Sequence, residues 1–115
     1  MSIEEAVYLS RDGAVATIHL NRPAKRNALN GAMWQRLAAV VDDADRDPAV
    51  KVVVVTGAGQ TFAAGADIDE FNAVFSDSNA ADATAAITYQ AQKRLYRNTK
   101  PTIAKIRGAC VGGGC

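Results

Sequence analysis

Histidine, cysteine and tryptophan are scarce in this chain, which limits the chemistry it can carry. The 115 residues include two cysteines, one tryptophan and a single histidine, His19. No spacing of histidine and cysteine resembles a metal site, so we expect no metal ion. A pair of cysteines in a short chain without secretory features favours free thiols over a disulfide.

The chain also lacks an excess of charge of either sign and a long apolar run. Lysine and arginine number 13 and aspartate and glutamate 12, which gives a formal net charge of +1. No global field therefore attracts nucleic acid or an acidic membrane, and an anionic ligand must be held by local groups. The N-terminus is acidic, and no segment fits a signal peptide or a membrane span. We expect a cytoplasmic protein with no nucleic-acid or membrane partner.

What is present fits one small folded domain of mixed α/β type. Hydrophobic residues make up 49% and charged residues 22% of the chain, which is ordinary for a soluble globular protein. Periodicity and turn residues predict the following order: a hairpin over 6–20 with an Asp12-Gly13 turn, a loop to Asn30, a helix from Gly31 to Pro48 with Asn30 as N-cap, a strand over 52–55, a short helical turn over 67–71, a helix over 81–98 and a strand over 102–106.

The strand Val52–Val55 is an unbroken run of valine. Such a run is typical of a central strand buried on both faces of a parallel sheet. Glycine-rich segments follow this strand, over 56–65, and the last predicted strand, over 108–114. In α/β architecture both lie at the carboxyl end of the sheet, where ligands usually bind.

Glycine-rich loops allow bare backbone N–H groups to approach a ligand closely. Two such preorganised donors suit a thioester carbonyl that becomes an enolate or a tetrahedral oxyanion. Composition and spacing alone support no more than a ligand-binding loop, because glycines after strands more often form simple turns.

Several short motifs occur along nearly the whole chain in a particular order. They are Leu20-Asn21-Arg22-Pro23, Asn27-Ala28-Leu29, the strand ending at Thr56, Phe62-Ala63-Ala64-Gly65-Ala66-Asp67-Ile68, and Gly108 with Gly112-Gly113-Gly114-Cys115. Together they resemble the crotonase (enoyl-CoA hydratase/isomerase) family. The resemblance implies an α/β, crotonase-like ββα spiral around a mostly buried sheet, of which residues 1–115 form the N-terminal part of one domain.

The resemblance also implies a site. An acyl-CoA thioester would be bound with its carbonyl oxygen held by the backbone N–H groups of Ala66 and Gly113. The other binding residues that it implies are Ala64, Asp67 and Ile68 along the adenine and pantetheine path, Lys25 and Arg26 near the CoA phosphates, and Gly112. Coenzyme A would be part of the substrate, and no separate cofactor is expected.

Each side-chain assignment has a structural alternative. Lys25 and Arg26 fit a solvated loop pair equally well, and Asp67 is explained as a helix cap that only lines the site. His19 fits a surface or edge position better than a catalytic base. The two cysteines are interpreted as buried packing residues beside glycines, and not as nucleophiles.

In the family, one catalytic carboxylate directly follows the residue matching Cys115 and a second lies further on. We therefore expect the chain to be truncated before the catalytic glutamates and the isolated 115 residues to be inactive. The complete protein is expected to be an enoyl-CoA hydratase of fatty acid metabolism, assembled as a homotrimer or dimer of trimers. Isomerase or another crotonase-branch reaction is the alternative, since some branches use an acid at the position of Asp69 and Glu70.

Two other kinds of protein are considered: a dinucleotide-binding module and a non-catalytic subunit. Gly57-Ala58-Gly59 follows a strand as a dinucleotide fingerprint would, but Phe62 stands where the third glycine belongs, and no acidic residue clearly ends a second strand about 20 residues on. A non-catalytic CoA-binding or assembly subunit is the better explanation if the chain ends at Cys115.

Overall fold

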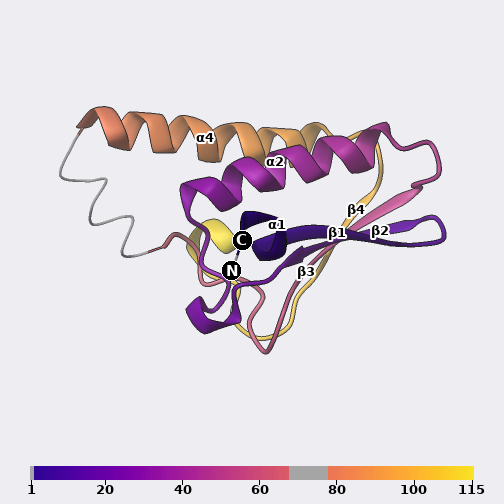
Figure 1. Ribbon diagram of the computed structural model, residues 1–115, viewed down its shortest axis with the longest axis horizontal. Coiled ribbons are helices and arrows are strands. Elements are labelled where there is room, and N and C mark those ends of the chain that lie inside the picture. Colours follow the sequence, from indigo (N-terminus) through magenta and orange to yellow (C-terminus); the bar gives the residue numbers. More distant parts are fainter. Residues whose placement is uncertain (1, 68–77) are drawn as a thin grey trace.

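The computed structural model describes residues 2–67 and 78–115 and has mixed α/β structure (Figure 1). Its elements are, in order, α1 (Ile3–Ala6), β1 (Val7–Asp12), β2 (Val15–Leu20), the 3-10 turn η1 (Pro23–Lys25), α2 (Gly31–Arg46), β3 (Val52–Gly57), α4 (Ser78–Arg97), β4 (Thr102–Lys105) and the 3-10 turn η2 (Gly112–Gly114). The predicted order of the strands and the two long helices is confirmed, whereas α1 and the two 3-10 turns were not predicted. Of the predicted helical turn over 67–71, only Asp67 lies within the described residues.

The four strands form one sheet in the order β1-β2-β3-β4. The β1–β2 hairpin is antiparallel, as expected, and Gly13 at its turn has a φ of 59°, in the left-handed region that favours glycine. β2, β3 and β4 run parallel to one another, so their carboxyl ends share one edge of the sheet. β3 lies between two neighbours, which confirms that it is central.

Only one face of the sheet is covered by the described part of the chain. Figure 1 shows α2 and α4 side by side on the same face. Val53 and Val55 point into this core and are buried, whereas Val52 and Val54 on the other face are only half-buried. The prediction that β3 is buried on both faces was therefore wrong for the described residues, because both long helices pack on one side. β4 is exposed along all four residues.

Helix α2 supplies most of the helical side of the core. Its N-cap is Asn30, as predicted, with the side-chain oxygen accepting a hydrogen bond from the Met33 N–H at 2.9 Å. One side of the helix is buried against the sheet and α4 and consists of Met33, Trp34, Leu37, Ala38, Val40, Val41 and Ala44. Full burial of a large apolar side chain contributes about 1.5–3 kcal/mol, so this face anchors the loop that precedes it.

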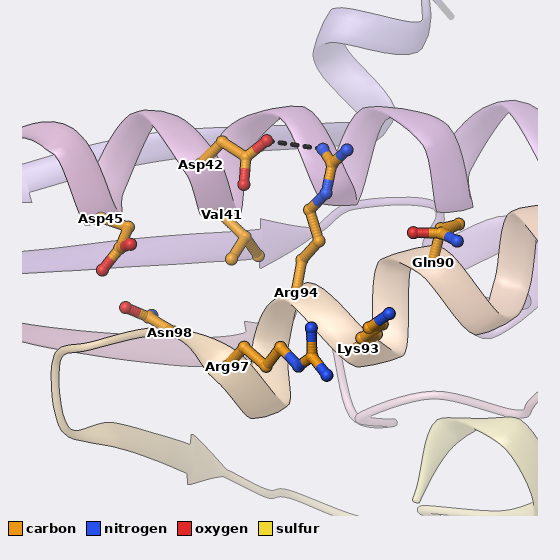
Figure 2. Close-up of a pocket in the computed structure, with 8 residues that line it drawn as sticks. All are labelled: Val41, Asp42, Asp45, Gln90, Lys93, Arg94, Arg97 and Asn98. Carbon is orange, nitrogen blue, oxygen red and sulfur yellow. Dashed lines mark hydrogen bonds and ion pairs between the residues drawn. The ribbon is translucent and has the colours of Figure 1, made fainter.

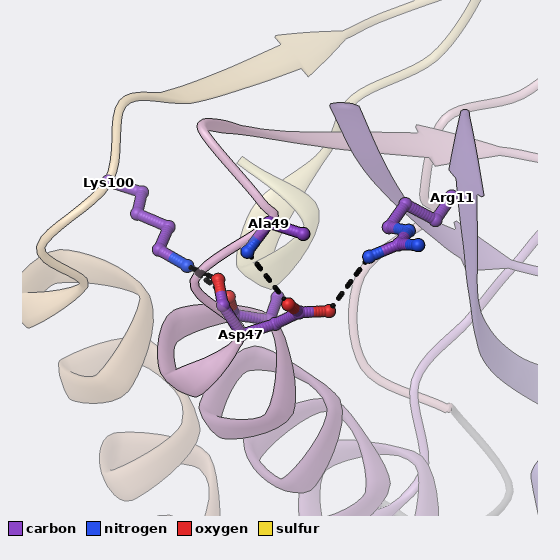
Figure 3. Close-up of polar contacts among 5 residues, drawn as sticks. Arg11, Asp47, Ala49 and Lys100 are labelled. Atoms are coloured by element: carbon purple, nitrogen blue, oxygen red, sulfur yellow. Dashed lines mark hydrogen bonds and ion pairs between the residues drawn. The ribbon is translucent and has the colours of Figure 1, made fainter. Parts of the chain in front are cut away.

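The end of α2 is tied to the segment that leads into β4 (Figure 3). The Lys100 ammonium donates to the carbonyl oxygen of Ala44 at 2.7 Å and to that of Asp47. The Asp47 carboxylate accepts from the Ala49 N–H at 2.9 Å and from Arg11 at 3.3 Å. A cation at the carboxyl end of a helix satisfies its last carbonyls and complements the helix dipole. These contacts fix where β4 begins.

Helix α4 packs along α2 and begins three residues earlier than the predicted start at 81. Ala91 is buried, and Ile87 and Leu95 pack against the core, which confirms the predicted apolar face. Arg94 forms an ion pair with Asp42 of α2 at 2.5 Å.

His19 lies on the uncovered face of the sheet. Its ring stacks on Tyr8 of β1 with 4.4 Å between the ring centroids, and its Nε2 is 2.7 Å from the Ser10 hydroxyl oxygen. Partial burial lowers the pKa of His19 below its ordinary value of 6.5. These contacts explain the residue structurally, and it lies on an inner strand of the sheet rather than at an edge.

Candidate functional site: two backbone donors between glycine-rich loops

The loops that follow β3 and β4 meet at the carboxyl edge of the sheet. Ala63 and Cys110 form a parallel bridge, and the Ala63 N–H donates to the Ala109 carbonyl at 3.2 Å. The Val111 N–H in turn donates to the Ala63 carbonyl at 3.1 Å. A short ladder therefore holds the two glycine-rich segments together.

A third segment, the loop between β2 and α2, joins the same assembly. Leu29 and Ala66 form a second parallel bridge, in which the Leu29 N–H donates to the Gly65 carbonyl at 2.8 Å. The Asp67 N–H donates to the Leu29 carbonyl at 3.1 Å. The Ala64 N–H donates to the Arg26 carbonyl at 3.0 Å. Segments around residues 26–29, 63–67 and 109–114 thus converge on one place.

The peptide unit between Gly65 and Ala66 has a defined orientation. In a trans peptide the C=O and the N–H point in opposite directions, and no peptide bond among the described residues is cis. Because the Gly65 carbonyl points to the Leu29 N–H, the Ala66 N–H points away from the 26–29 segment. It donates to no acceptor within the described residues.

The peptide unit between Gly112 and Gly113 is arranged in the same way. The Gly112 carbonyl accepts from the Cys115 N–H at 3.1 Å, so the Gly113 N–H points outward from the start of η2. N–H groups at the first turn of a helix have no partner within it, and Gly113 donates to no other acceptor in residues 2–67 and 78–115.

The two free donors belong to neighbouring backbone segments. A Cβ atom built on Gly65 would lie 3.5 Å from the Gly113 nitrogen and 2.9 Å from the Val111 carbonyl oxygen. The φ of Gly65 is 98°, which L side chains rarely adopt. This approach therefore requires glycine at position 65, and it places the segment that carries the Ala66 N–H next to the segment that carries the Gly113 N–H.

An apolar cavity of about 370 Å³ opens beside the Gly113 donor. Its walls include Leu20, Leu29, Trp34, Leu37, Val55 and Phe62. Gly113 borders this cavity, whereas both Ala66 and Gly113 are exposed in the described part of the chain.

The Asn27 side chain connects the loop between β2 and α2 to the loop that follows β3. It is fully buried, with 0% exposure. Its Oδ1 accepts from the Arg22 N–H at 2.8 Å. Its Nδ2 donates to the carbonyl oxygens of Ala58 at 2.9 Å, Thr61 at 2.8 Å and Phe62 at 3.3 Å. Asn27 belongs to one of the motifs seen in the sequence, but the motif alone predicted no role for its side chain.

The Asp67 carboxylate is buried and accepts a hydrogen bond from Arg22 Nη1 at 2.6 Å. The helix that it was predicted to cap lies in the segment outside the described residues, as does Ile68. Lys25 and Arg26 are exposed, and Arg26 has a left-handed backbone with a φ of 53°. The structure therefore places Ala64 and Arg26 in direct backbone contact, with Asp67 beside them and Lys25 on the adjoining turn.

The two cysteines lie on the second glycine loop with their sulfur atoms 3.6 Å apart. Cys110 is half-buried and Cys115 is exposed, so the prediction that both are buried was wrong. Each thiol donates to a backbone carbonyl. Burial raises the pKa of the Cys110 thiol, and the hydrogen bond to Cys115 and its charge add to this effect. A protonated thiol is a weak nucleophile.

Within residues 2–67 and 78–115, no group of three potential metal ligands occurs.

A polar pocket of about 340 Å³ lies between α2 and α4, at the opposite end of the sheet from the glycine loops (Figure 2). Arg94 pairs with Asp42 across it, and Arg97 and Lys93 lie along the last turns of α4. Cations at the end of a helix are explained by the helix dipole, so the pocket needs no ligand to account for them.

The loop after β3 does not have the form of a dinucleotide-binding loop. A side chain at Gly57 would meet the carbonyl oxygens of Thr61 and Phe62 and the amide of Asn27. Up to Asp67 the segment turns back and forms bridges instead of opening a helix.

The fold is mixed α/β, and the N–H groups of Ala66 and Gly113 have no acceptor within the described residues. The model of the enoyl-CoA hydratase/isomerase family matches residues 10–115, so the chain belongs to this family. No helix in the described part of the chain is long and apolar enough to cross a membrane.

Relatives within this family carry different activities. The chain is 37% identical to 2,3-dehydroadipyl-CoA hydratase of Escherichia coli, over 95% of this chain and 41% of the relative. It is 35% identical to the mitochondrial Delta(3,5)-Delta(2,4)-dienoyl-CoA isomerase of Mus musculus, over 87% of this chain and 33% of the relative. A solved enoyl-CoA hydratase/carnithine racemase from Magnetospirillum magneticum superposes with a TM-score of 0.90 and 41% identity, over 95% of this chain and 41% of that one. The chain thus spans about two fifths of the length of these hydratase and racemase relatives.

Proposed function

We propose that this chain binds an acyl-CoA thioester, with the thioester oxygen between the N–H groups of Ala66 and Gly113, and that the whole protein is an enoyl-CoA hydratase. One observation carries the proposal. Two adjacent peptide units have their carbonyls engaged by the protein and their N–H groups directed outward without an acceptor in the described residues. Family membership supplies the chemistry of the ligand.

The donors stabilise the negatively charged transition state and enolate more than they stabilise the neutral bound thioester. When water adds to a 2-enoyl thioester, negative charge develops on the carbonyl oxygen as an enolate forms. Hydrogen bonds to a charged acceptor are about twice as strong as those to a neutral one, so the two N–H groups lower the barrier to reaction. The donors need no reorganisation, because Leu29 and Cys115 already hold the opposite ends of their peptide units.

The remaining proposed contacts concern coenzyme A. Exposed Lys25 and Arg26 offer cations to its phosphates, which a chain of nearly neutral net charge needs locally. Ala64, Asp67 and Ile68 are proposed to line the adenine and pantetheine path, with Gly112 beside the donor loop. Coenzyme A enters as part of the substrate, and no further cofactor is proposed. We also propose that the whole protein is cytoplasmic, acts in fatty acid metabolism and assembles as a homotrimer or dimer of trimers.

Isomerisation of an enoyl-CoA is the second candidate. Identity to the Escherichia coli hydratase and to the mouse isomerase is nearly equal, at 37% and 35%. Both reactions pass charge onto the thioester oxygen, so the described site serves either one.

The test compares two ligands that differ only in the carbonyl. Hexanoyl-CoA and hexyl-CoA, a thioether with the same chain length, are titrated against the protein by calorimetry. Two net hydrogen bonds at about 0.5–1.5 kcal/mol each predict that the thioester binds roughly 5- to 150-fold more tightly. Equal affinity for the two ligands would refute the carbonyl-binding site. Crotonyl-CoA hydration and double-bond migration, assayed on the same sample, separate hydratase from isomerase. Binding without either reaction by the whole protein would indicate a CoA-binding subunit, whereas the isolated 115 residues are expected to bind without reacting.

A further inference from the structure

The Ala66 donor depends on a bridge that side chains reinforce. Leu29 contacts the backbone on both sides of Ala66: its N–H donates to the Gly65 carbonyl and its carbonyl accepts from the Asp67 N–H. The direction of the Ala66 N–H is therefore set by the position of the 28–29 backbone relative to the 65–67 backbone.

Arg22 joins these two backbone segments through a single nitrogen. Its Nη1 donates to the Asp67 carboxylate at 2.6 Å and to the Ala28 carbonyl at 3.3 Å. Asp67 directly follows Ala66, and Ala28 directly precedes Leu29. The guanidinium thus spans the bridge that orients the donor.

This ion pair is largely shielded from solvent. The Arg22 and Asp67 side chains are 23% and 9% exposed, so solvent screens the pair weakly. Arg22 is itself held at the backbone, because its N–H donates to Asn27 Oδ1 and its carbonyl accepts from the Lys25 and Asn27 N–H groups. A fixed guanidinium can transmit that order to the segment it contacts.

We propose that Arg22 is a positioning residue for the thioester site, acting through Asp67 to hold the Ala66 N–H on the carbonyl oxygen. The inference rests on the proposed function. It predicts that loss of the Arg22 side chain weakens the hydrogen bond to a bound carbonyl and leaves contacts to the rest of coenzyme A intact.

The direct readout is the infrared stretching band of a bound thioester. Hexanoyl-CoA labelled with ¹³C at the carbonyl is added to the purified protein, and the band is compared with that of the free ligand. Hydrogen bonds to the oxygen lower the frequency. In the Arg22→Met variant we expect at least half of this downshift to disappear. Loss of one net hydrogen bond of about 0.5–1.5 kcal/mol predicts hexanoyl-CoA affinity reduced about 2- to 12-fold. Affinity for hexyl-CoA, which has no carbonyl, should stay the same.

Three further variants separate positioning from general stability. Arg22→Lys keeps a cation beside Asp67 and should restore most of the downshift. Arg36→Met is the matched control, because Arg36 is a half-buried arginine that bonds the Val7 carbonyl at 3.1 Å, away from the loops; its downshift should equal that of the wild type. The double variant Arg22→Met/Asp67→Leu leaves no unpaired buried charge and carries the test if Arg22→Met does not fold.

The outcomes distinguish the two proposals. No downshift in the wild type would overturn the proposed function and the inference with it. A wild-type downshift that persists unchanged in Arg22→Met, or in the double variant if the single variant does not fold, would overturn the inference alone. So would an equal loss of affinity for hexanoyl-CoA and hexyl-CoA.

Discussion

Replacement of Asn27 should be among the most damaging single changes in the described part of the chain. The Asn27 amide group has two hydrogens, which serve the carbonyls of Ala58 and Thr61 at 2.9 and 2.8 Å and share a third contact with Phe62 at 3.3 Å. Its oxygen accepts from the Arg22 N–H at 2.8 Å. Asn27→Ala therefore leaves three well-formed hydrogen bonds unmade at a site with 0% exposure.

The expected loss follows from these contacts. A buried group left without its partner costs about 1–3 kcal/mol, so three such bonds give a destabilisation of roughly 3 kcal/mol or more. The φ of Asn27 is 57°, and alanine tolerates this left-handed region less well than asparagine, which adds about 1 kcal/mol. Asn27→Gly should recover that last contribution and nothing else.

Urea unfolding monitored by circular dichroism measures the change. Asn27→Asp is the sharpest variant, because it keeps the shape and the acceptor for Arg22 but turns an oxygen toward three carbonyl oxygens. Asn21→Asp is the matched control, since Asn21 Nδ2 makes a single bond, to the Glu5 carbonyl at 3.1 Å. If Asn27→Asp were as stable as Asn21→Asp, the central place given to Asn27 would be wrong.

Three further changes test other parts of the structure. Gly65→Ala introduces a methyl group 2.9 Å from the Val111 oxygen at a φ of 98°. It should lower the free energy of unfolding by about 1–3 kcal/mol and reduce the preference for hexanoyl-CoA over hexyl-CoA. An unchanged preference would contradict the proposed carbonyl-binding site. Lys100→Met removes the two bonds at the end of α2 and should lower the free energy of unfolding by about 1 kcal/mol, whereas exposed Lys51→Met, as control, should not. Burial lowers the pKa of folded His19 below 6.5, so the unfolded state binds more protons just below that pH. The contribution of His19 to the free energy of unfolding should therefore be full above pH 6.5 and fall as the pH is lowered through the folded pKa. Unfolding of His19→Gln, measured from pH 8 to 5, should not show this fall.

The sequence predicted the elements well because their signals are local. The Asn30 cap, the apolar face of α2 and the valine run of β3 each depend on neighbours within a few residues. Burial of both faces of β3 was predicted wrongly, because the side on which a helix packs is a tertiary property. Val52 and Val54 have the same side chains as Val53 and Val55, yet they are only half-buried.

The candidate site could be predicted only in part for the same reason. Glycines after strands indicated no more than a ligand-binding loop, and only the family resemblance implied Ala66 and Gly113, whose N–H groups point outward in the structure. Arg22 is paired with Asp67, which is 45 residues further along the sequence. The three carbonyls to which Asn27 donates are 31–35 residues further along. No pattern within a single segment of sequence reports such contacts, so both residues were recognised as motif letters without a role.

The engaged carbonyl at Gly65 has a consequence for the strength of the donor next to it. Accepting a hydrogen bond from Leu29 withdraws electron density through the conjugated amide, which makes the Ala66 hydrogen more positive. Such chains of hydrogen bonds polarise one another by about 10–30% per bond. The bond from Leu29 at 2.8 Å therefore does more than hold the backbone in place. It makes the Ala66 N–H a stronger donor than an isolated amide, by an electronic effect that no side chain at position 66 can add or remove.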